Sequence, residues 1–129
     1  MIKKYEPVEG RNAEIIEDVM SCPEILALDE DKQFKIRLCV EEVEENILGY
    51  SGTTWVEVLA HLENGMLSIC FRDEGVAFNP LARPDPDINA SVEERSIGGL
   101  GIFICKKMMD DISYKLENGC NVLTLFLKV

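Results

Sequence analysis

Two Asn-Gly turns between segments of alternating apolar and polar residues constrain this fold most. Asn64-Gly65 separates residues 54–62 from residues 67–73, and in both segments every second residue is apolar. Alternation has the period of a half-buried strand, and Asn-Gly suits the tight turn of a hairpin. A second turn, at residues 117–119, joins strands that we predict at 112–116 and 121–128. The sequence therefore predicts two β-hairpins.

Helices are predicted between and before these hairpins. The strongest covers residues 31–50, where Ile36, Val40, Val43 and Ile47 recur at steps of four, three and four and form one apolar stripe. Further helices are expected at 11–22, ending at Pro23, and after Gly101, and a short strand at 2–8. This order predicts an α+β fold, a two-layer sandwich of a mixed sheet with helices on one face.

Length and charge bound the functions that the chain can have. Its 129 residues predict a single domain over 1–129. The net charge, 13 − 24 = −11, disfavours direct binding to nucleic acid or to an anionic membrane. The sequence has no signal-peptide pattern and no membrane-length apolar run, and its five cysteines form no C-x-x-C pair. We expect a cytoplasmic protein with reduced thiols.

The first candidate for chemistry is on the long predicted helix. Glu42 and Asn46 are four residues apart, so they project from one face beside the apolar stripe. An amide oxygen beside a carboxylate suits Mg²⁺, and the carboxylate can orient or deprotonate a hydroxyl. The alternative is that such acidic residues only form a solvated face, which is the interpretation we adopt for Glu44 and Glu45.

Two further candidates flank a loop at residues 74–98 that is rich in proline. Asp73 ends a predicted buried strand and can accept a hydrogen bond from an exocyclic amine, while Gly75 allows close approach to a base. A plain Asp/Gly turn is the alternative. Gly98, Gly99, Leu100 and Gly101 precede a helix, and their backbone amides can face an anion. A simple hinge is the alternative there, and the long loop predicts a lid.

The order of these motifs resembles a known fold. Glu41-Glu42-(x)₃-Asn46, the segment from Asp73 to Leu81, and residues 97–103 followed by Met108-Met109-Asp110 resemble the Bergerat ATP-binding fold of the GHKL superfamily. That superfamily includes gyrase, heat-shock chaperones, histidine kinases and MutL. The details are similar to its anti-sigma-factor and serine-kinase branch. The resemblance covers essentially the whole chain and implies a histidine-kinase-like ATPase domain with a long ATP lid.

The resemblance implies roles for individual residues. Asn46 matches the asparagine that coordinates Mg²⁺, and Glu42 matches the catalytic general base. Asp73, with Gly75 beside it, matches the aspartate that recognises adenine, and Gly98–Gly101 match the phosphate-facing loop. Asn121 stands where many relatives have a Gly-Thr pair that reaches adenine through water, with Thr124 as the alternative. Arg95 is a candidate contact for the γ-phosphate, or else a surface arginine paired with Glu93 or Glu94.

The implied function is an ATP-dependent and Mg²⁺-dependent serine/threonine protein kinase that resembles anti-sigma factors. It would sequester a sigma factor, phosphorylate a serine of an antagonist protein, and form a homodimer. Two departures concern the site: residue 77 is Ala where many relatives have Gly, and Glu45 stands where they often have Thr. The alternatives are a non-catalytic nucleotide-dependent binding module, a detached histidine-kinase-type ATPase domain, and a structural domain that binds no nucleotide.

Overall fold

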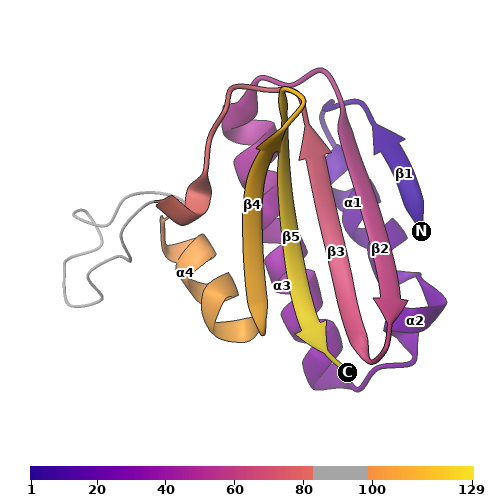
Figure 1. Cartoon of the computed structure of the whole chain (residues 1–129). Helices are drawn as coiled ribbons and strands as arrows, with labels where there is room; N and C mark the ends of the chain where they lie inside the picture. Colours follow the sequence, from indigo (N-terminus) through magenta and orange to yellow (C-terminus); the bar gives the residue numbers. More distant parts are fainter. Residues whose placement is uncertain (83–98) are drawn as a thin grey trace.

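Five strands form one open sheet in residues 1–82 and 99–129, the part of the chain that the computed structural model describes (Figure 1). The sheet order is β1-β2-β3-β5-β4. The strands are β1 (Ile2–Tyr5), β2 (Val56–Glu63), β3 (Met66–Asp73), β4 (Asp111–Glu117) and β5 (Cys120–Lys128). The helices lie behind this sheet, on one face: α1 (Arg11–Met20), α2 (Pro23–Leu26), α3 (Glu30–Asn46) and α4 (Gly99–Met108).

The two predicted hairpins are confirmed. Asn64 and Gly65 have φ angles of 52° and 75°, and Asn118 and Gly119 have 52° and 78°. Two successive positive φ values belong to the tight turn whose twist matches that of the flanking strands, which is why Asn-Gly is favoured there. β2 pairs with β3 and β4 pairs with β5, each in antiparallel register across its turn.

The two-layer α+β architecture is also confirmed, but the sheet is antiparallel throughout its described part, where a mixed sheet was expected. β3 and β5 pair antiparallel although α4 and β4 separate them in sequence. The chain leaves β3, forms α4 and β4, and only then returns as β5 between β3 and β4. The sequence pattern shows where strands begin and end, but it does not show into which gap a later strand inserts.

Helix α3 is the central helix of the second layer and bears out the strongest helix prediction. It begins at the cap residue Asp29, whose side chain accepts a hydrogen bond from Lys32 N at 2.8 Å. Its buried side is formed by Ile36, Cys39, Val40, Val43 and Glu44. The helix continues into a π-helical turn at Ile47–Ser51 and ends at Gly52, which is left-handed with φ 65°. Because α1 and α4 both contact α3, this helix links the two sides of the helical layer.

The short helix α2 is a difference from the prediction. Pro23 was expected only to end the preceding helix, whereas it is the first residue of α2, and α1 already ends at Met20. Proline is favoured in the first turn of a helix, where its missing N–H costs no hydrogen bond.

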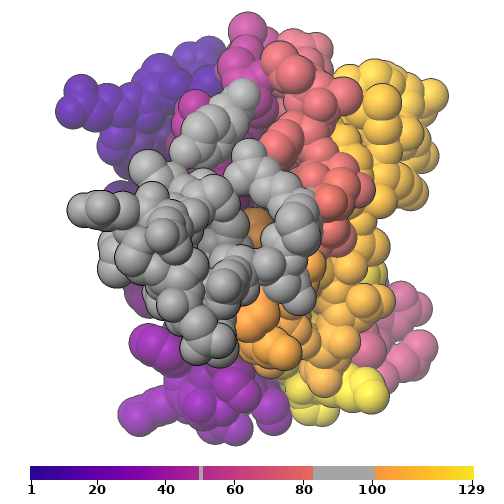
Figure 2. Space-filling view, turned by 90° about the vertical axis from the view of Figure 1, so that its left-hand side faces the viewer, coloured from indigo at the N-terminus to yellow at the C-terminus, as the bar shows by residue number. Residues whose placement is uncertain are grey.

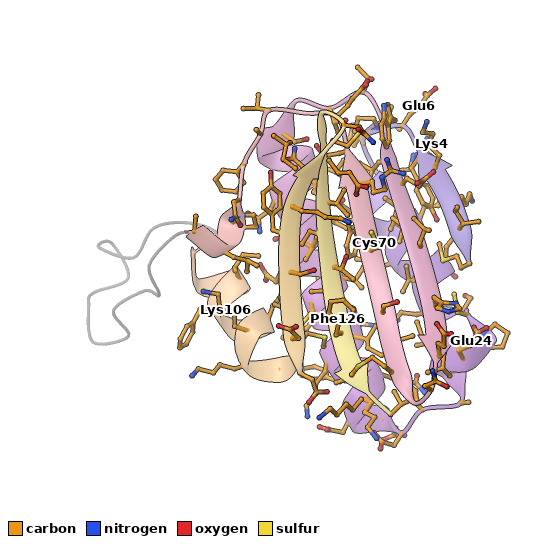
Figure 3. All side chains as sticks on the ribbon, viewed as in Figure 1. Lys4, Glu6, Glu24, Cys70, Lys106 and Phe126 are labelled. Atoms are coloured by element: carbon orange, nitrogen blue, oxygen red, sulfur yellow. The ribbon has the colours of Figure 1, made fainter. Side chains whose placement is uncertain are left out.

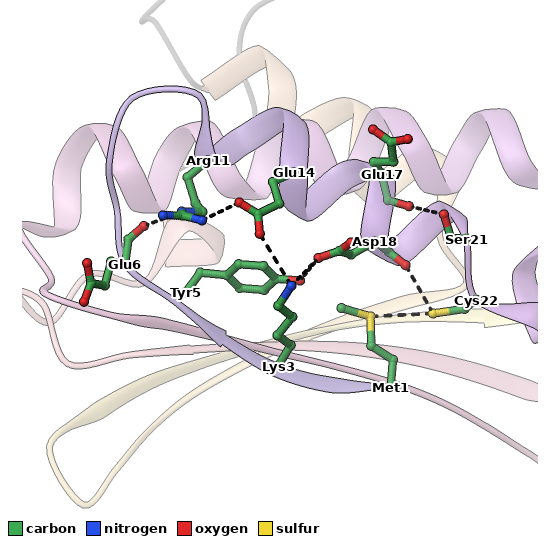
Figure 4. A network of polar contacts seen from close by, with 10 residues as sticks. All are labelled: Met1, Lys3, Tyr5, Glu6, Arg11, Glu14, Glu17, Asp18, Ser21 and Cys22. Atoms are coloured by element: carbon green, nitrogen blue, oxygen red, sulfur yellow. Dashed lines mark hydrogen bonds and ion pairs between the residues drawn. The ribbon is translucent and has the colours of Figure 1, made fainter.

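Strand β1 is held to α1 by a network of polar side chains (Figure 4). The Tyr5 hydroxyl donates to Asp18 Oδ2 at 2.8 Å, and Lys3 Nζ lies 3.0 Å from the same carboxylate oxygen. Arg11 pairs with Glu14, which also contacts Lys3. The network therefore joins the edge strand to the helical layer.

The opposite face of the sheet carries side chains such as Cys70 and Phe126, which point away from the helices (Figure 3). Both are half-buried by their neighbours on that face. No helix among the described residues has the length and apolar character needed to cross a bilayer.

The register of the sheet places two polar residues at one end of the core. The inward residues of β3 are Leu67, Ile69 and Phe71, and Asp73 continues the same alternation. Asp73 pairs with Asn121 of β5, which begins the inward row that Leu123, Leu125 and Leu127 continue. A carboxylate and an amide therefore lie side by side at the rim of an apolar core.

Candidate functional site

Asp73 is 3% exposed and has one carboxylate oxygen fixed by the protein. Its Oδ1 accepts hydrogen bonds from Gly75 N at 2.9 Å and from Asn121 Nδ2 at 3.1 Å. No donor among residues 1–82 and 99–129 reaches Oδ2, and Asp73 lines a pocket. This carboxylate is therefore held in place by one oxygen and can offer the other to a ligand.

The pocket lies between α3, the end of β3 and the β4–β5 hairpin. Its walls are mostly apolar, with a few polar groups at its rim, as is usual for sites that bind flat aromatic ligands. Figure 2 views this side, where α4 (orange) lies below the segment that follows β3 (salmon). The lining residues are Val43, Asn46, Ile47, Ser51, Asp73, Val76, Phe78, Pro80, Ile102, Tyr114, Asn121 and Leu123.

Gly75 lets the loop after β3 press against the end of the π-helical turn. A Cβ atom added at Gly75 would lie 2.2 Å from the backbone oxygen of Ser51 and 2.6 Å from its Cβ. A hydrogen bond from Val76 N to Ser51 O, at 2.8 Å, joins the same two segments. Gly75 therefore allows two backbone segments to approach each other. The sequence motif alone had suggested only that Gly75 allows the backbone to approach a base.

We expect Gly75→Ala to destabilise the fold by about 1–3 kcal/mol, because the methyl group meets backbone atoms that can move only together. Denaturant unfolding measures this change. Gly49→Ala is the matched control, since a Cβ atom at Gly49 has no neighbour within 4 Å and its φ is not positive. Equal stability of the two variants would contradict the proposed packing.

Glu42 of α3 lies against the first turn of α4. A Cβ atom added at Gly101 would lie 2.0 Å from Glu42 Oε2, so this glycine gives the carboxylate its space. Partial burial, and then the nearby Glu45 and Glu41, raise the pKa of Glu42 above its usual value. The sequence-predicted pair of Glu42 and the glycine turn is thus brought together in space.

Asn46 lies one turn after Glu42 on the same side of α3 and lines the pocket. Its Nδ2 donates to the backbone oxygen of Glu42 at 3.0 Å, and no described residue donates to its Oδ1. A fixed amide oxygen of this kind fits Mg²⁺, which commonly takes one or two protein oxygens and completes its shell with water and phosphate. Among the described residues, no three acidic, histidine or cysteine side chains are arranged so that they could hold a metal ion by themselves.

Glu44 corrects the expectation of a solvated face. It is 1% exposed, and neither of its carboxylate oxygens has a hydrogen-bond partner among residues 1–82 and 99–129, whereas its neighbour Glu45 is exposed as expected. Burial raises the pKa of Glu44 from 4.5 to about 9. Glu44 lies on the far side of α3 from Asn46, because residues two apart on a helix point in different directions. It belongs to the core and not to the pocket.

Asn121 makes several hydrogen bonds at the pocket rim. Beyond Asp73, its Nδ2 lies 3.0 Å from the backbone oxygen of Val76 and 3.4 Å from that of Gly75. Its Oδ1 accepts from Phe78 N at 3.2 Å and from the Tyr114 hydroxyl. Thr124, the alternative to Asn121, is half-buried on the opposite face of β5, where it pairs with Cys70.

Tyr114 was missed in the sequence as a site residue. The alternation of the strand could have found it, because Ile112, Tyr114 and Leu116 share the inward face of β4. Ser51 left no such signal, since its place depends on the π-helical turn. Of the phosphate-loop residues, Gly99 and Leu100 begin α4, whereas Arg95 and Gly98 lie outside the described residues, as does most of the predicted lid.

Residues 9–127 match the model of the histidine kinase-like ATPase domain. The chain belongs to this family. The resemblance to GHKL ATPases is therefore confirmed, and so is the histidine-kinase-like fold. Membership makes this a kinase-like ATPase domain, a type of domain that binds ATP.

Two known proteins are similar to this chain, one in sequence and one in structure. The serine/threonine-protein kinase BtrW of Bordetella bronchiseptica is 28% identical to this chain, over 72% of this chain and 68% of its own length. The histidine kinase AdeS of Acinetobacter baumannii has a similar structure, with a TM-score of 0.54 at 11% identity. That match covers 99% of this chain and 67% of AdeS, and it shows the shared fold alone.

Proposed function

We propose that this chain is a Mg²⁺-dependent and ATP-dependent serine/threonine protein kinase that also regulates a partner protein by binding it. One observation carries this proposal. Asp73 and Asn46, from two separate motifs, line one pocket, and Glu42, from the same motif as Asn46, lies against the start of α4. Asp73 provides an acceptor for a base, Asn46 an oxygen for a metal, and Glu42 a carboxylate for a reacting hydroxyl.

At the base end, Asp73 recognises adenine. Its Oδ1 is occupied by Gly75 N and Asn121 Nδ2, so Oδ2 is the oxygen that accepts from the exocyclic amine. The apolar walls of Val76, Phe78 and Ile102 lie beside it and suit the faces of a purine ring.

At the phosphate end, the first turn of α4 faces the triphosphate. A helix begins with unsatisfied N–H groups and positive partial charge, and both favour an anion. Gly98, Gly99, Leu100 and Gly101 supply these amides in our proposal, and Arg95 contacts the γ-phosphate. Asn46 Oδ1 holds Mg²⁺, which neutralises charge on the phosphates when bound.

Glu42 acts as the general base. Its raised pKa brings it closer to the range in which a carboxylate both accepts and releases a proton near neutral pH. It orients the hydroxyl of a partner serine for attack on the γ-phosphate and takes its proton. As the serine oxygen bonds to the γ-phosphorus, the bond from that phosphorus to the bridging oxygen of the β-phosphate breaks, and ADP is the leaving group.

The partners that we propose are a sigma factor and an antagonist protein whose serine is phosphorylated. The likeness to BtrW, which is named a serine/threonine-protein kinase, supports the kinase part of this proposal. The sigma factor, the antagonist and a homodimer follow from the resemblance to anti-sigma factors. The net charge of −11 fits protein partners with basic surfaces better than nucleic acid or an anionic membrane.

Nucleotide binding tests the proposal directly. We expect ATP and ADP to bind the wild-type chain in calorimetry, and Asp73→Asn to bind at least about tenfold more weakly. The variant must keep its oxygen toward Gly75 N and Asn121 Nδ2, so its amide nitrogen takes the place of Oδ2 and opposes the amine of adenine. A wild-type chain without affinity for nucleotide would refute the function, whereas equal affinity of the variant would refute only the role of Asp73.

A non-catalytic nucleotide-binding module is the second candidate function. The observation that favours it is Glu45, an exposed carboxylate next to the metal-binding Asn46, which can repel the phosphates of a bound nucleotide. Such a module would bind nucleotide and partner but transfer no phosphate. A detached histidine-kinase-type ATPase domain would instead hydrolyse ATP or phosphorylate a histidine.

A further inference from the structure

The amide of Asn121 is hydrogen-bonded to Asp73, to the loop after β3 and to Tyr114 of β4. Its nitrogen reaches the Asp73 carboxylate and the backbone oxygens of Gly75 and Val76. Its oxygen accepts from Phe78 N, so the loop from 73 to 78 closes around this one side chain. Asn121 is 6% exposed, and the two hydrogens of its amide already face three acceptors.

The hydroxyl of Tyr114 determines which way this amide points. It donates to Asn121 Oδ1 from β4, which flanks β5 on the side opposite β3, the strand of Asp73. With Oδ1 engaged by Tyr114 and Phe78 N, Nδ2 must face Asp73. The reversed amide would place its oxygen against the carboxylate, and two acceptors there would repel each other.

We propose that Asn121 and Tyr114 are positioning residues for base recognition, an inference that rests on the proposed binding of adenine nucleotides. Tyr114 orients Asn121, and Asn121 holds Asp73 Oδ1 so that Oδ2 is presented to the pocket. Asn121 then acts through Asp73 and the loop, and it needs no hydrogen bond of its own to the nucleotide. The pair makes the site selective for bases with an exocyclic amine at the position that meets Oδ2.

This arrangement has a consequence for discrimination between bases. Adenine carries an amine where hypoxanthine carries a carbonyl oxygen, and the two bases are otherwise close in shape. A carboxylate oxygen that is held in place accepts a hydrogen bond from the amine of adenine. It repels the carbonyl oxygen of hypoxanthine, because both atoms carry negative partial charge. A carboxylate that can rotate binds the amine less tightly and repels the carbonyl oxygen less strongly. The ratio of affinities for ADP and for inosine diphosphate therefore reports how firmly Asp73 is held.

The test uses Tyr114→Phe, which removes only the hydroxyl from a half-buried ring at the edge of the sheet. We expect its affinity for ADP in calorimetry to fall about fivefold, the usual effect of one lost hydrogen bond. Affinity for inosine diphosphate should fall less, so that the ratio between the two nucleotides decreases at least about threefold. Asn121→Ala should decrease the ratio further.

Tyr5→Phe is the matched control. Tyr5 also donates its hydroxyl to a side chain, Asp18, but does so in the network between β1 and α1, and Tyr5 does not line the pocket. We expect both affinities and their ratio to stay as in the wild-type chain. A Tyr114→Phe variant that binds both nucleotides like the wild type, or that loses both in equal proportion, would overturn the inference. Failure of the wild-type chain to bind ADP at all would instead refute the proposed function.

Discussion

Glu42→Gln should lower the rate of phosphoryl transfer to a partner serine by at least about a hundredfold, the usual contribution of a general base. Glutamine keeps the shape of the side chain that fits against Gly101, but it cannot accept the proton of the serine hydroxyl. The affinity for ATP should change by less than about threefold, since this carboxylate faces the reacting hydroxyl and not the base. Incubation with labelled ATP and candidate antagonist proteins measures transfer, and calorimetry measures affinity.

Glu41→Gln controls for the loss of one negative charge on the same helix turn. Glu41 is exposed and lies outside the pocket, on the groove between α1 and α3. Transfer that persists in Glu42→Gln would contradict the role of Glu42 as base. Nucleotide binding without transfer in the wild-type chain, across all partners tried, would support the non-catalytic module.

Glu44→Met should stabilise the fold by about 3 kcal/mol at pH 7. The wild-type carboxyl is buried, with no hydrogen-bond partner in the described part of the chain, and burial raises its pKa from 4.5 to about 9 on folding. Between these values the unfolded chain has released the proton and the folded chain still holds it. Folding is therefore opposed increasingly as the pH rises, by about 1.4 kcal/mol per pH unit. Methionine fills a similar volume and removes this cost.

Denaturant unfolding of both proteins from pH 5 to pH 9 measures the effect. The difference in unfolding free energy between variant and wild type should grow with pH across this range and level off above it. Glu45→Met changes the neighbouring, exposed position, and we expect it to alter stability by less than about 0.5 kcal/mol at every pH. A difference for Glu44→Met that does not depend on pH would show that this carboxyl is ionised in the folded chain.

Local patterns predicted much of this fold. The two Asn-Gly turns, the alternation in β2 to β5 and the apolar stripe of α3 depend on residues close together in sequence, and the structure confirms them. The antiparallel insertion of β5 and the burial of Glu44 depend on which surfaces meet after folding. Glu44 is polar at a position that faces the core, so a rule that places charges in water fails there.

The candidate site divides in the same way. Asp73, Glu42 and Asn46 could be predicted as candidates because each belongs to a short motif whose chemistry suits a ligand. Tyr114 and Ser51 contribute through contacts with distant segments, and Gly75 meets the backbone of Ser51 as a result of the π-helical turn. Side chains that only orient another group carry a weaker sequence pattern than those that touch the ligand.

The place of β5 between β3 and β4 also affects how quickly the pocket can assemble. Asp73 and Asn121 are 48 positions apart, and β3 has no strand on that side until β5 arrives. Two segments this far apart can pair only after a long loop has closed. The chain loses conformational entropy in that step before any contact compensates the loss, so folding is slow. We therefore expect the hairpin of β2 and β3 to form early in refolding, and nucleotide binding to be regained only with the slowest phase.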